Sequence, residues 1–303
     1  ILTLLALGQA QAAKRPNILF MMSDDHASEG IGAYSSWLKD YVHTPAIDQL
    51  AAEGMRFTNV CCNTSICSPS RATILTGQYS HKNGVPSLNG AISEDSPQVA
   101  AELQKAGYQT AVFGKWHLTS QPKGFDAYKV TRGQGSWFDP VFYTQTGQWY
   151  GKKKKRDRVP GEKHQGYCSD VYTDQALQWL KARDAKKPFC MMLHFKAPHH
   201  SYEYPERWKD YLKDTLIPEP PSLHEDVEKT SPLLKGVHTW HMVDKNGYFG
   251  RHENDKEPPM WPHDGSIRSK TSAAYQHMIH KYLRAVGAVD DNIKRVIDYL
   301  EKQ

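Results

Sequence analysis

Five side chains that could bind a ligand or take part in catalysis follow predicted strands directly. They are two carboxylates, a lysine and two histidines: Asp24, Asp25, Lys115, His117 and His199. Parallel α/β sheets place their ligands at the carboxyl ends of their strands, so loops that leave one edge converge on one region. The sequence therefore predicts a single polar site built from several loops.

The carboxylate pair Asp24-Asp25 has neither lysine nor arginine beside it in the sequence. Two adjacent carboxylates need a cation or a shared proton, and oxygen ligands suit a hard metal such as calcium or magnesium. A solvated turn or a helix cap is the simpler alternative for an isolated Asp-Asp pair. The pair predicts a metal site only in combination with the other residues around it.

Cys67 can join them, because it lies at the N-terminus of a helix predicted to begin at Ser68-Pro69. The helix dipole and the free amides there stabilise an anion, so a thiol at this position should be activated. The alternative is a small buried hydrophobe. The neighbouring residues favour chemistry, since the segment 67–71 is Cys-Ser-Pro-Ser-Arg and the helix ends in Thr-Gly.

This segment resembles the signature of the sulfatase family, Cys-x-Pro-Ser-Arg followed by a short helix that ends in Thr-Gly. Further segments stand in the family's order along nearly the whole chain: Arg15-Pro16-Asn17, Asp24-Asp25, Thr44-Pro45, Gly114-Lys115-Trp116-His117, Ala197-Pro198-His199 and Val289-Asp290-Asp291. The chain is thus similar to the type I, formylglycine-dependent sulfatases. This resemblance implies an α/β, alkaline-phosphatase-like sandwich with a central, mostly parallel sheet flanked by helices.

The resemblance implies a sulfuric ester hydrolase whose signature cysteine, here Cys67, is oxidised to formylglycine by a maturation enzyme. In that family the hydrated aldehyde attacks sulfur and releases the alcohol, and its second hydroxyl then expels sulfate. A plain alcohol would leave a stable sulfate ester, whereas a geminal diol can collapse. The resemblance also implies one calcium ion, bound by Asp24, Asp25 and the converted Cys67, with Arg71 holding the formylglycine oxygens.

The same resemblance assigns the residues that contact sulfate. Lys115 matches the lysine that neutralises a sulfate oxygen, and His117 matches the histidine that contacts the hydrate. His199 matches the histidine that protonates the leaving oxygen, which is the role of a general acid, while the cations stabilise the charge on sulfate. His200 is the neighbouring alternative, and His199 is preferred because it directly follows Pro198.

Strand and helix signals alternate along the chain, which argues for a parallel sheet covered by helices. We expect strands at 18–22, 55–60, 108–113 and 189–195, and helices at 45–53, 68–76, 97–106, 169–182 and 275–300. The last helix has the clearest 3.6-residue period. Residues 199–270 have no clear periodicity and are interpreted as a long insertion over one edge of the sheet, which would shape a sugar pocket.

The composition of the 303-residue chain, 39% hydrophobic and 23% charged, is that of a globular protein. Its net charge of +5 is concentrated in Lys152–Arg158. This segment is interpreted as a solvated loop, with a contact to a polyanionic substrate as the alternative. The sequence shows no broad basic face that would indicate a nucleic-acid partner, and no apolar run long enough to span a membrane.

The first residues predict export. Residues 1–7 are almost wholly apolar and Ala10-Gln11-Ala12 is a small-x-small cleavage pattern, so residues 1–13 are interpreted as the remnant of a secretory signal peptide. We expect a periplasmic or secreted protein, in a compartment that permits disulfides. Three of the five cysteines are expected to be buried thiols in strands or at their ends: Cys61, Cys62 and Cys190.

Residues 14–303 are expected to form the N-terminal part of a sulfatase catalytic domain. The family supplies further calcium ligands, an Asp followed by His, Gln or Asn, and usually another lysine, from a strand after the final helix. This sequence has no such strand after residue 300. The chain is therefore expected to be an N-terminal fragment with an incomplete active site.

The expected substrate is a sulfated carbohydrate of glycan degradation. Three segments look like those of bacterial mucin-desulfating enzymes, which act on 6-sulfated N-acetylglucosamine: Thr64-Ser65-Ile66-Cys67, Gly77-Gln78-Tyr79-Ser80-His81 and His194-Phe195-Lys196-Ala197-Pro198-His199. Two alternatives remain open at this point. One is a phosphate or phosphonate ester hydrolase of the same superfamily, and the other is a non-catalytic remnant that binds sulfated glycans.

Overall fold

The computed structural model describes residues 15–146, 161–225, 247–256 and 258–303, together with Lys229, Leu233 and Val243. The predicted signal-peptide remnant at 1–13 and the basic segment Lys152–Arg158 lie outside the described residues. Within the described part of the chain, no helix combines the length and the apolar character that a membrane span requires.

A four-stranded parallel sheet forms the centre of the molecule, in the order β1-β6-β2-β3. Its strands are β1 (Ile18–Met22), β6 (Phe189–His194), β2 (Gln109–Lys115) and β3 (Ala127–Thr131). Every pairing in this sheet is parallel, so all four carboxyl ends lie at one edge. The α/β class and the mostly parallel sheet expected from the sequence are thereby confirmed.

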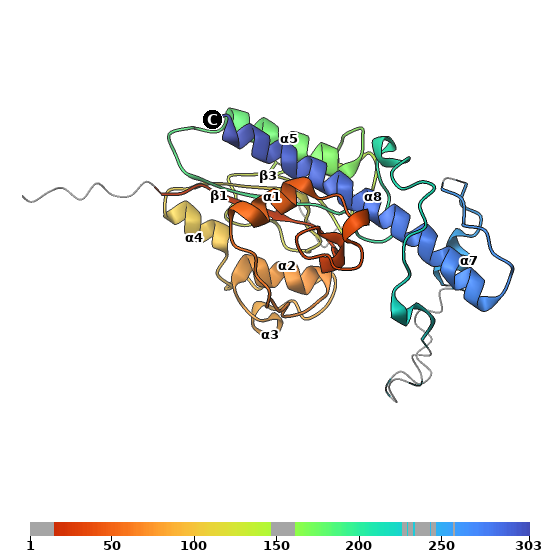
Figure 1. The fold of residues 1–303 in the computed structure, drawn as a ribbon. Helices are drawn as coiled ribbons and strands as arrows, with labels where there is room; N and C mark the ends of the chain where they lie inside the picture. The colour runs from red at the N-terminus through yellow and green to blue at the C-terminus, as the bar shows by residue number, and fades with distance from the viewer. Residues whose placement is uncertain are drawn as a thin grey trace, which may run out of the picture.

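Helices cover both faces of this sheet (Figure 1). One face carries α1 (Pro45–Glu53), α5 (Cys168–Ala182) and α8 (Ile267–Glu301), and the other carries α2 (Cys67–Thr76), α3 (Ser80–Asn83) and α4 (Val99–Lys105). Alternate residues of β2 enter the two cores, because successive side chains of a strand point to opposite faces: Ala111 and Phe113 pack with α5, and Val112 packs with α2 and α4.

The helix α8 is the longest element, with 35 residues that would span about 52 Å at the α-helical rise. Its N-cap is Ser266, whose side chain accepts a hydrogen bond from the amide of Ser269. The helix predicted at 275–300 is confirmed and begins earlier, at Ile267. Its N-terminal half extends beyond the sheet and carries α7 (Tyr248–His252) (Figure 1).

The start of α1 is capped by a distant residue. Thr44 occupies the N-cap position, but its side chain makes no capping hydrogen bond. Instead the carboxylate of Asp290, on α8, accepts hydrogen bonds from the amides of Ala46 at 3.0 Å and Ile47 at 2.9 Å. Free amides at a helix start need acceptors, so Asp290 joins α1 to α8.

The strand predicted at 55–60 is wrong. This segment is extended chain on the surface, where Met55, Phe57 and Val60 are 77%, 62% and 76% exposed. Alternation of apolar residues produces a strand only where a neighbouring edge and a covering layer exist, and the described residues provide neither here. Cys61 and Cys62 are therefore exposed rather than buried, while Cys190 is buried as expected.

The edge strand β3 (Ala127–Thr131) was not predicted. Its apolar segment is short, and Lys129 interrupts it. An edge strand tolerates such a residue, and Lys129 lies 3.5 Å from Glu162 in the two-residue strand β5 (Glu162–Lys163). This strand pairs with β4 (Val141–Phe142) in a second, two-stranded sheet.

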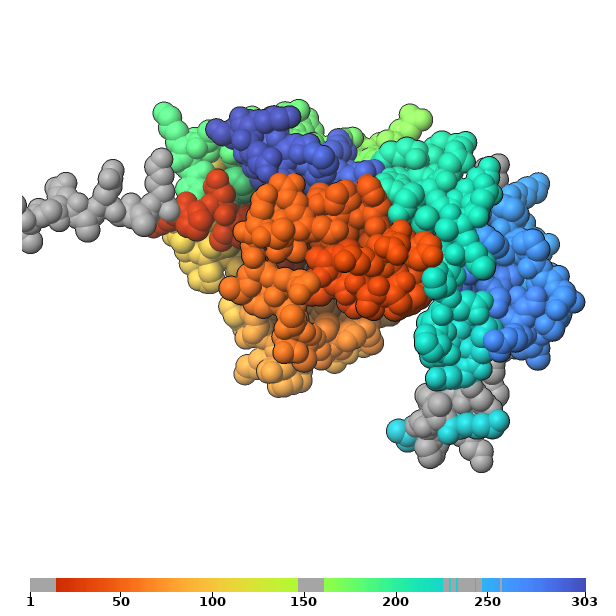
Figure 2. Space-filling model, in the orientation of Figure 1, coloured from red at the N-terminus to blue at the C-terminus, as the bar shows by residue number. Residues whose placement is uncertain are grey.

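The insertion expected at 199–270 is described in part. It contains the short 3-10 helices η4 (Glu206–Trp208) and η5 (Pro221–His224), followed by α7. The described part packs along α8, where the ring of Trp208 lies over Gly287. Figure 2 shows this teal and light-blue part projecting from one end of the molecule.

Candidate active site

The predicted polar site forms at the carboxyl ends of the strands. Its centre is Asp24, directly after β1. One oxygen of Asp24, Oδ2, lies 2.8 Å from Arg71 Nη2 and 2.5 Å from Lys115 Nζ. The other oxygen, Oδ1, lies 3.5 Å from Cys67 Sγ, and Lys115 Nζ lies 3.8 Å from the same sulfur. The structure thus brings a carboxylate, two cations and the signature cysteine together.

Helix geometry places Cys67 and Arg71 on the same side of α2, because residues four apart in an α-helix are neighbours. Arg71 also donates from Nη1 to the carbonyl oxygen of Lys115 at 2.6 Å. Since Lys115 is the last residue of β2, this bond ties the helix to the strand that supplies the second cation. Both cations are buried, with side chains 3% and 0% exposed.

The charges in this cluster favour an anion. Burial alone would raise the pKa of Asp24, but the guanidinium of Arg71 and the ammonium of Lys115 outweigh it and hold the pKa at about 2. One ionised carboxylate therefore faces two buried cations. Buried charges need partners, and the excess positive charge beside Cys67 is suited to a group such as sulfate.

The expectation that the Cys67 thiol is activated is wrong for the unmodified residue. Burial, followed by the neighbouring charge of Asp24, raises the pKa of Cys67 above its usual value, and the nearby cations do not compensate. The thiolate is the nucleophilic form of cysteine. The thiolate fraction of unmodified Cys67 is therefore below that of an exposed cysteine at the same pH.

His117 lies at the same edge, two residues after β2 ends. Its backbone is left-handed, with φ of 52°, and its carbonyl accepts a 2.6 Å hydrogen bond from Ser68 Oγ. Burial, followed by the charge of Lys115, lowers the pKa of His117 to about 4, so the ring is neutral near neutral pH. Its Nδ1 is buried and has no hydrogen-bond partner among the described residues.

His199, rather than His200, completes the cluster. Its Nε2 lies 3.5 Å from Asp25 Oδ2, and its Nδ1 lies 2.5 Å from the carbonyl oxygen of His200. The ring of His200 instead contacts Tyr202 and other side chains of the insertion. The cis peptide between Ala197 and Pro198 precedes His199 in this loop.

A metal ion could be held at this site by oxygen ligands. Asp24, Cys67 and His199 offer an oxygen, a sulfur and a nitrogen within 4.8 Å of one another, and of these only the Asp24 oxygen is a hard ligand. Asp25 is the neighbouring carboxylate in the sequence. The Oδ1 of Asp24 remains free of the two cations, which both contact Oδ2. Carboxylate oxygens suit a hard cation such as calcium, which takes six to eight oxygen ligands, so Asp24 and Asp25 fit part of a calcium site.

Two polar residues of the site were not predicted, namely Lys196 and Gln134. Gln134 follows β3, and its Oε1 accepts a 2.6 Å hydrogen bond from Lys115 Nζ. Lys196 is 3% exposed, donates to the Gln134 carbonyl oxygen at 3.1 Å and lies 4.6 Å over the Trp137 ring. Burial, followed by the charge of Lys115, lowers the pKa of Lys196 to about 8.

A signal for both residues existed in the sequence. Lys196 stands in the same strand-end loop as His199, so the rule that selected Lys115 should have selected it too. Gln134 lies between two glycines, Gly133 and Gly135, that both adopt positive φ, but it was missed because β3 was missed.

The fold and this cluster define an α/β protein that can bind an anion beside a cysteine at the ends of parallel strands. The sulfatase family model matches residues 16–303. The chain therefore belongs to the sulfatase family, as the resemblance of its signature segment predicted.

Two curated relatives illustrate the range of similarity. The chain is 35% identical to N-acetylglucosamine-6-O-sulfatase of Bacteroides thetaiotaomicron over 97% of this chain and 56% of that protein. It is 40% identical to arylsulfatase G of Rattus norvegicus, over 38% of this chain and 24% of that protein. The chain thus spans about half the length of the N-acetylglucosamine-6-O-sulfatase.

Solved structures give the same fold. One, a complex with its substrate D-glucosamine-2-N,6-O-disulfate, has a TM-score of 0.77 and 33% identity, and the match covers 95% of this chain and 63% of that chain. A phosphonate monoester hydrolase from Silicibacter pomeroyi has a TM-score of 0.66 and 23% identity, over 95% and 60% of the two chains. This second likeness shows the shared alkaline-phosphatase-like fold alone.

Proposed function

We propose that the protein removes sulfate from a sulfated carbohydrate, with 6-sulfated N-acetylglucosamine as the narrower substrate. The observation that carries this proposal is the position of Cys67, which lies between Asp24 and Lys115 with Arg71 behind it. Membership of the sulfatase family supports the ester class. The similarity to N-acetylglucosamine-6-O-sulfatase supports the sugar.

The nucleophile is formylglycine, produced from Cys67 by a maturation enzyme. This conversion supplies a hydrated aldehyde whose two hydroxyls allow attack on sulfur and later collapse. The raised pKa of the unmodified Cys67 supports the need for it, because a higher pKa lowers the fraction of the nucleophilic thiolate. Arg71 is in position to hold an oxygen of the converted residue, one helical turn away from it.

Lys115 and Arg71 stabilise the negative charge of the sulfate group. Lys115 and Arg71 are buried and already fixed by Asp24, so they need no rearrangement when negative charge develops on the sulfate oxygens. Gln134 holds Lys115 from the other side. His199 donates a proton to the leaving oxygen as general acid, and the neutral ring of His117 contacts the nucleophile.

Calcium, when bound by Asp24 and Asp25, would neutralise negative charge on the nucleophile and the sulfate. The chain's own carboxylates supply only part of a calcium ligand shell. Apolar residues 1–7 and the following Ala-x-Ala support export to the periplasm or the cell exterior, where calcium is available and disulfides are permitted.

The test is sulfate release by the purified full-length protein, with the Cys67 peptide analysed by mass spectrometry in the same preparation. We expect release from 6-sulfated N-acetylglucosamine only in preparations whose Cys67 mass is that of formylglycine. Full activity with an unmodified thiol would refute the role of the modification. Turnover of another sulfated sugar without this one would remove the narrower substrate.

Side-by-side assays with an aryl sulfate and an aryl phosphate test the alternative ester class. A preference for the phosphate would move the protein to the phosphate and phosphonate hydrolases. Glycan binding without any hydrolysis would instead support the non-catalytic alternative.

A further inference from the structure

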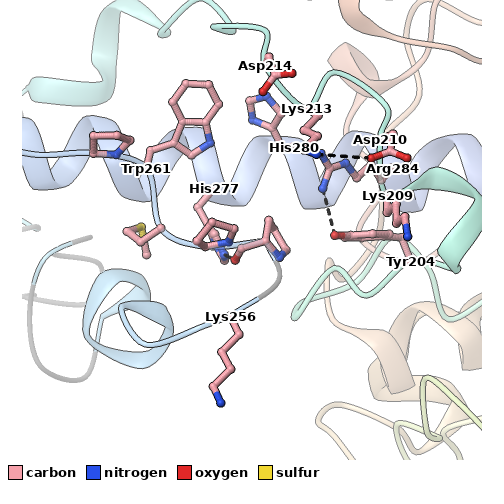
Figure 3. Close-up of a pocket in the computed structure, with 14 residues that line it drawn as sticks. Tyr204, Lys209, Asp210, Lys213, Asp214, Lys256, Trp261, His277, His280 and Arg284 are labelled. Carbon is pink, nitrogen blue, oxygen red and sulfur yellow. Dashed lines mark hydrogen bonds and ion pairs between the residues drawn. The ribbon is translucent and has the colours of Figure 1, made fainter.

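A cavity of about 620 Å³ lies away from the catalytic cluster, between α8 and two segments of the insertion (Figure 3). One wall comes from the insertion segment between Tyr204 and Asp214, the other from Lys256 and residues 258–262, and α8 contributes His277, His280 and Arg284. Its volume is within the range of small-molecule sites, which is about 300–1,000 Å³.

The buried cation Arg284 distinguishes this cavity. Its side chain is 3% exposed, and in the part of the chain that the structure describes, no carboxylate forms an ion pair with it. Its hydrogen bonds go to neutral groups, from Nε to the Tyr211 carbonyl oxygen at 3.0 Å and from Nη1 to the Tyr204 hydroxyl at 3.0 Å. A buried charge without a counter-charge is costly. A ligand with an anionic group could supply the counter-charge that Arg284 lacks among the described residues.

Both ends of the cavity carry aromatic rings. Trp261 packs against His280, with ring centroids 5.1 Å apart and planes 34° apart, and Tyr204 lies 5.1 Å from the Arg284 guanidinium. In Figure 3, Trp261 and Tyr204 lie at opposite ends of the lining group. Aromatic rings at both ends suit a sugar ring. Four cations and two carboxylates line the cavity, so positive charge is in excess: Lys209, Lys213, Lys256, Arg284, Asp210 and Asp214.

The histidines of the cavity are structural. His280 Nε2 contacts the carbonyl oxygens of Leu212 at 3.0 Å and Thr215 at 2.9 Å. Burial lowers the pKa of His280, so it does not compete with Arg284 for an anion. These contacts fix the insertion to α8 and keep the cavity in shape.

We propose that this cavity binds an anionic saccharide, with Arg284 holding its sulfate or carboxylate group and Trp261 and Tyr204 packing against the sugar. Guanidinium groups bind such planar or branched oxyanions with paired hydrogen bonds. The proposal rests on the proposed function, because the ligand is a second stretch of the glycan whose sulfate the catalytic cluster removes. Tyr204 is five residues from His199, so at most about 18 Å of chain separates them.

Calorimetric titration of a sulfated tetrasaccharide into the Cys67→Ala protein tests this site without hydrolysis. Arg284→Gln should weaken binding about tenfold or more, as expected for the loss of a charged hydrogen bond. Arg295→Gln is the matched control, since it makes the same change on the same helix, with Arg295 paired to Asp174 outside the cavity. It should leave the dissociation constant unchanged.

A second variant keeps the test valid if Arg284→Gln fails to fold, which its melting temperature will show. Trp261→Ala removes the aromatic ring from one end of the cavity and should weaken binding of the tetrasaccharide about fivefold. Unchanged binding in every folded cavity variant would overturn the proposal, even if sulfate release is normal. Weakened binding in the cavity variants, combined with no sulfate release by the full-length protein that carries formylglycine at position 67, would retain the cavity and remove the proposed function.

Three probes identify the anion. A hyaluronan tetrasaccharide carries carboxylates without sulfate, and chitotetraose is neutral. Binding of the sulfated sugar alone assigns the site to sulfate, and binding of both charged sugars assigns it to either anion. Equal binding of chitotetraose would overturn the role of Arg284.

Discussion

The catalytic cluster and the α8 cavity both bury cations, but they stabilise them differently. At the strand ends, Arg71 and Lys115 share the carboxylate of Asp24. In the cavity, Arg284 is held by a carbonyl oxygen and a tyrosine hydroxyl. The first arrangement fixes its cations by ion pairs in a rigid sheet edge, whereas the second leaves the charge to be completed by a ligand. The variants below should therefore act on one region and spare the other.

The largest effect should come from Cys67→Ala. Removal of the nucleophile should lower sulfate release about 10⁴-fold or more, and tetrasaccharide binding in the cavity should persist. Release is measured by ion chromatography and binding by calorimetry. Cys61→Ala is the control, because Cys61 is an exposed cysteine of the loop before α2. If the two variants were equally active, Cys67 would not be the nucleophile.

Asp24→Asn should destabilise the fold most. The change leaves Arg71 and Lys115 buried without their shared counter-charge, which should cost about 3–5 kcal/mol in the free energy of unfolding. Urea denaturation measures it, and Asp298→Asn, at an exposed ion pair on α8, should change the stability by less than about 1 kcal/mol. Arg284→Gln should lower the free energy of unfolding by less than Asp24→Asn does. It removes one buried charge, whereas Asp24→Asn leaves two buried cations without their counter-charge. The reverse order would contradict the comparison.

The pH dependence of stability tests the core beneath the cluster. Burial, followed by the charge of Arg71, lowers the pKa of His194 from 6.5 to about 3. The folded pKa is lower than the unfolded one, so the unfolded chain binds a proton at His194 more readily than the folded protein does. The free energy of unfolding is therefore unaffected by His194 above pH 6.5 and decreases as the pH falls from 6.5 towards 3. Neither ring nitrogen of His194 has a partner among the described residues.

His194→Leu should therefore reduce the loss of stability between pH 6.5 and pH 4 by on the order of 3 kcal/mol. Urea denaturation at several pH values measures this, and His81→Gln is the control because His81 is exposed. An identical pH profile in wild type and His194→Leu would show that His194 does not contribute.

Gly287→Ala should have the smallest effect of these changes and should act on the insertion. A β-carbon on Gly287 would lie 2.3 Å from the Trp208 ring, so Trp208 must move, at a cost of about 1–3 kcal/mol. Hydrogen exchange should increase in residues 204–217 while the strands stay protected. Equal changes throughout the chain would contradict a local effect.

Local sequence patterns predicted much of the fold, and the reasons are visible in particular segments. The apolar run that became β6 is buried along its whole length, the run that became β1 is partly buried at the edge of the sheet, and the periodic helix α8 has a wide apolar stripe, so each has one favourable state. The segment 55–60 had a strand pattern of similar quality and stayed on the surface. Its outcome depended on a neighbouring edge, which no local pattern encodes.

The sequence by itself determined which residues of this protein could carry chemistry: the Cys-Ser-Pro-Ser-Arg segment at 67–71, and Asp24, Lys115 and His199 at or after the ends of strands. Tertiary structure decided which partners those groups meet. It paired both cations with one oxygen of Asp24, brought Lys196 and Gln134 behind Lys115, selected His199 over His200, and supplied Asp290 as the cap of α1. The physical reason is that charge pairing and burial depend on distances between segments far apart in the chain, whereas motifs and periodicity are local.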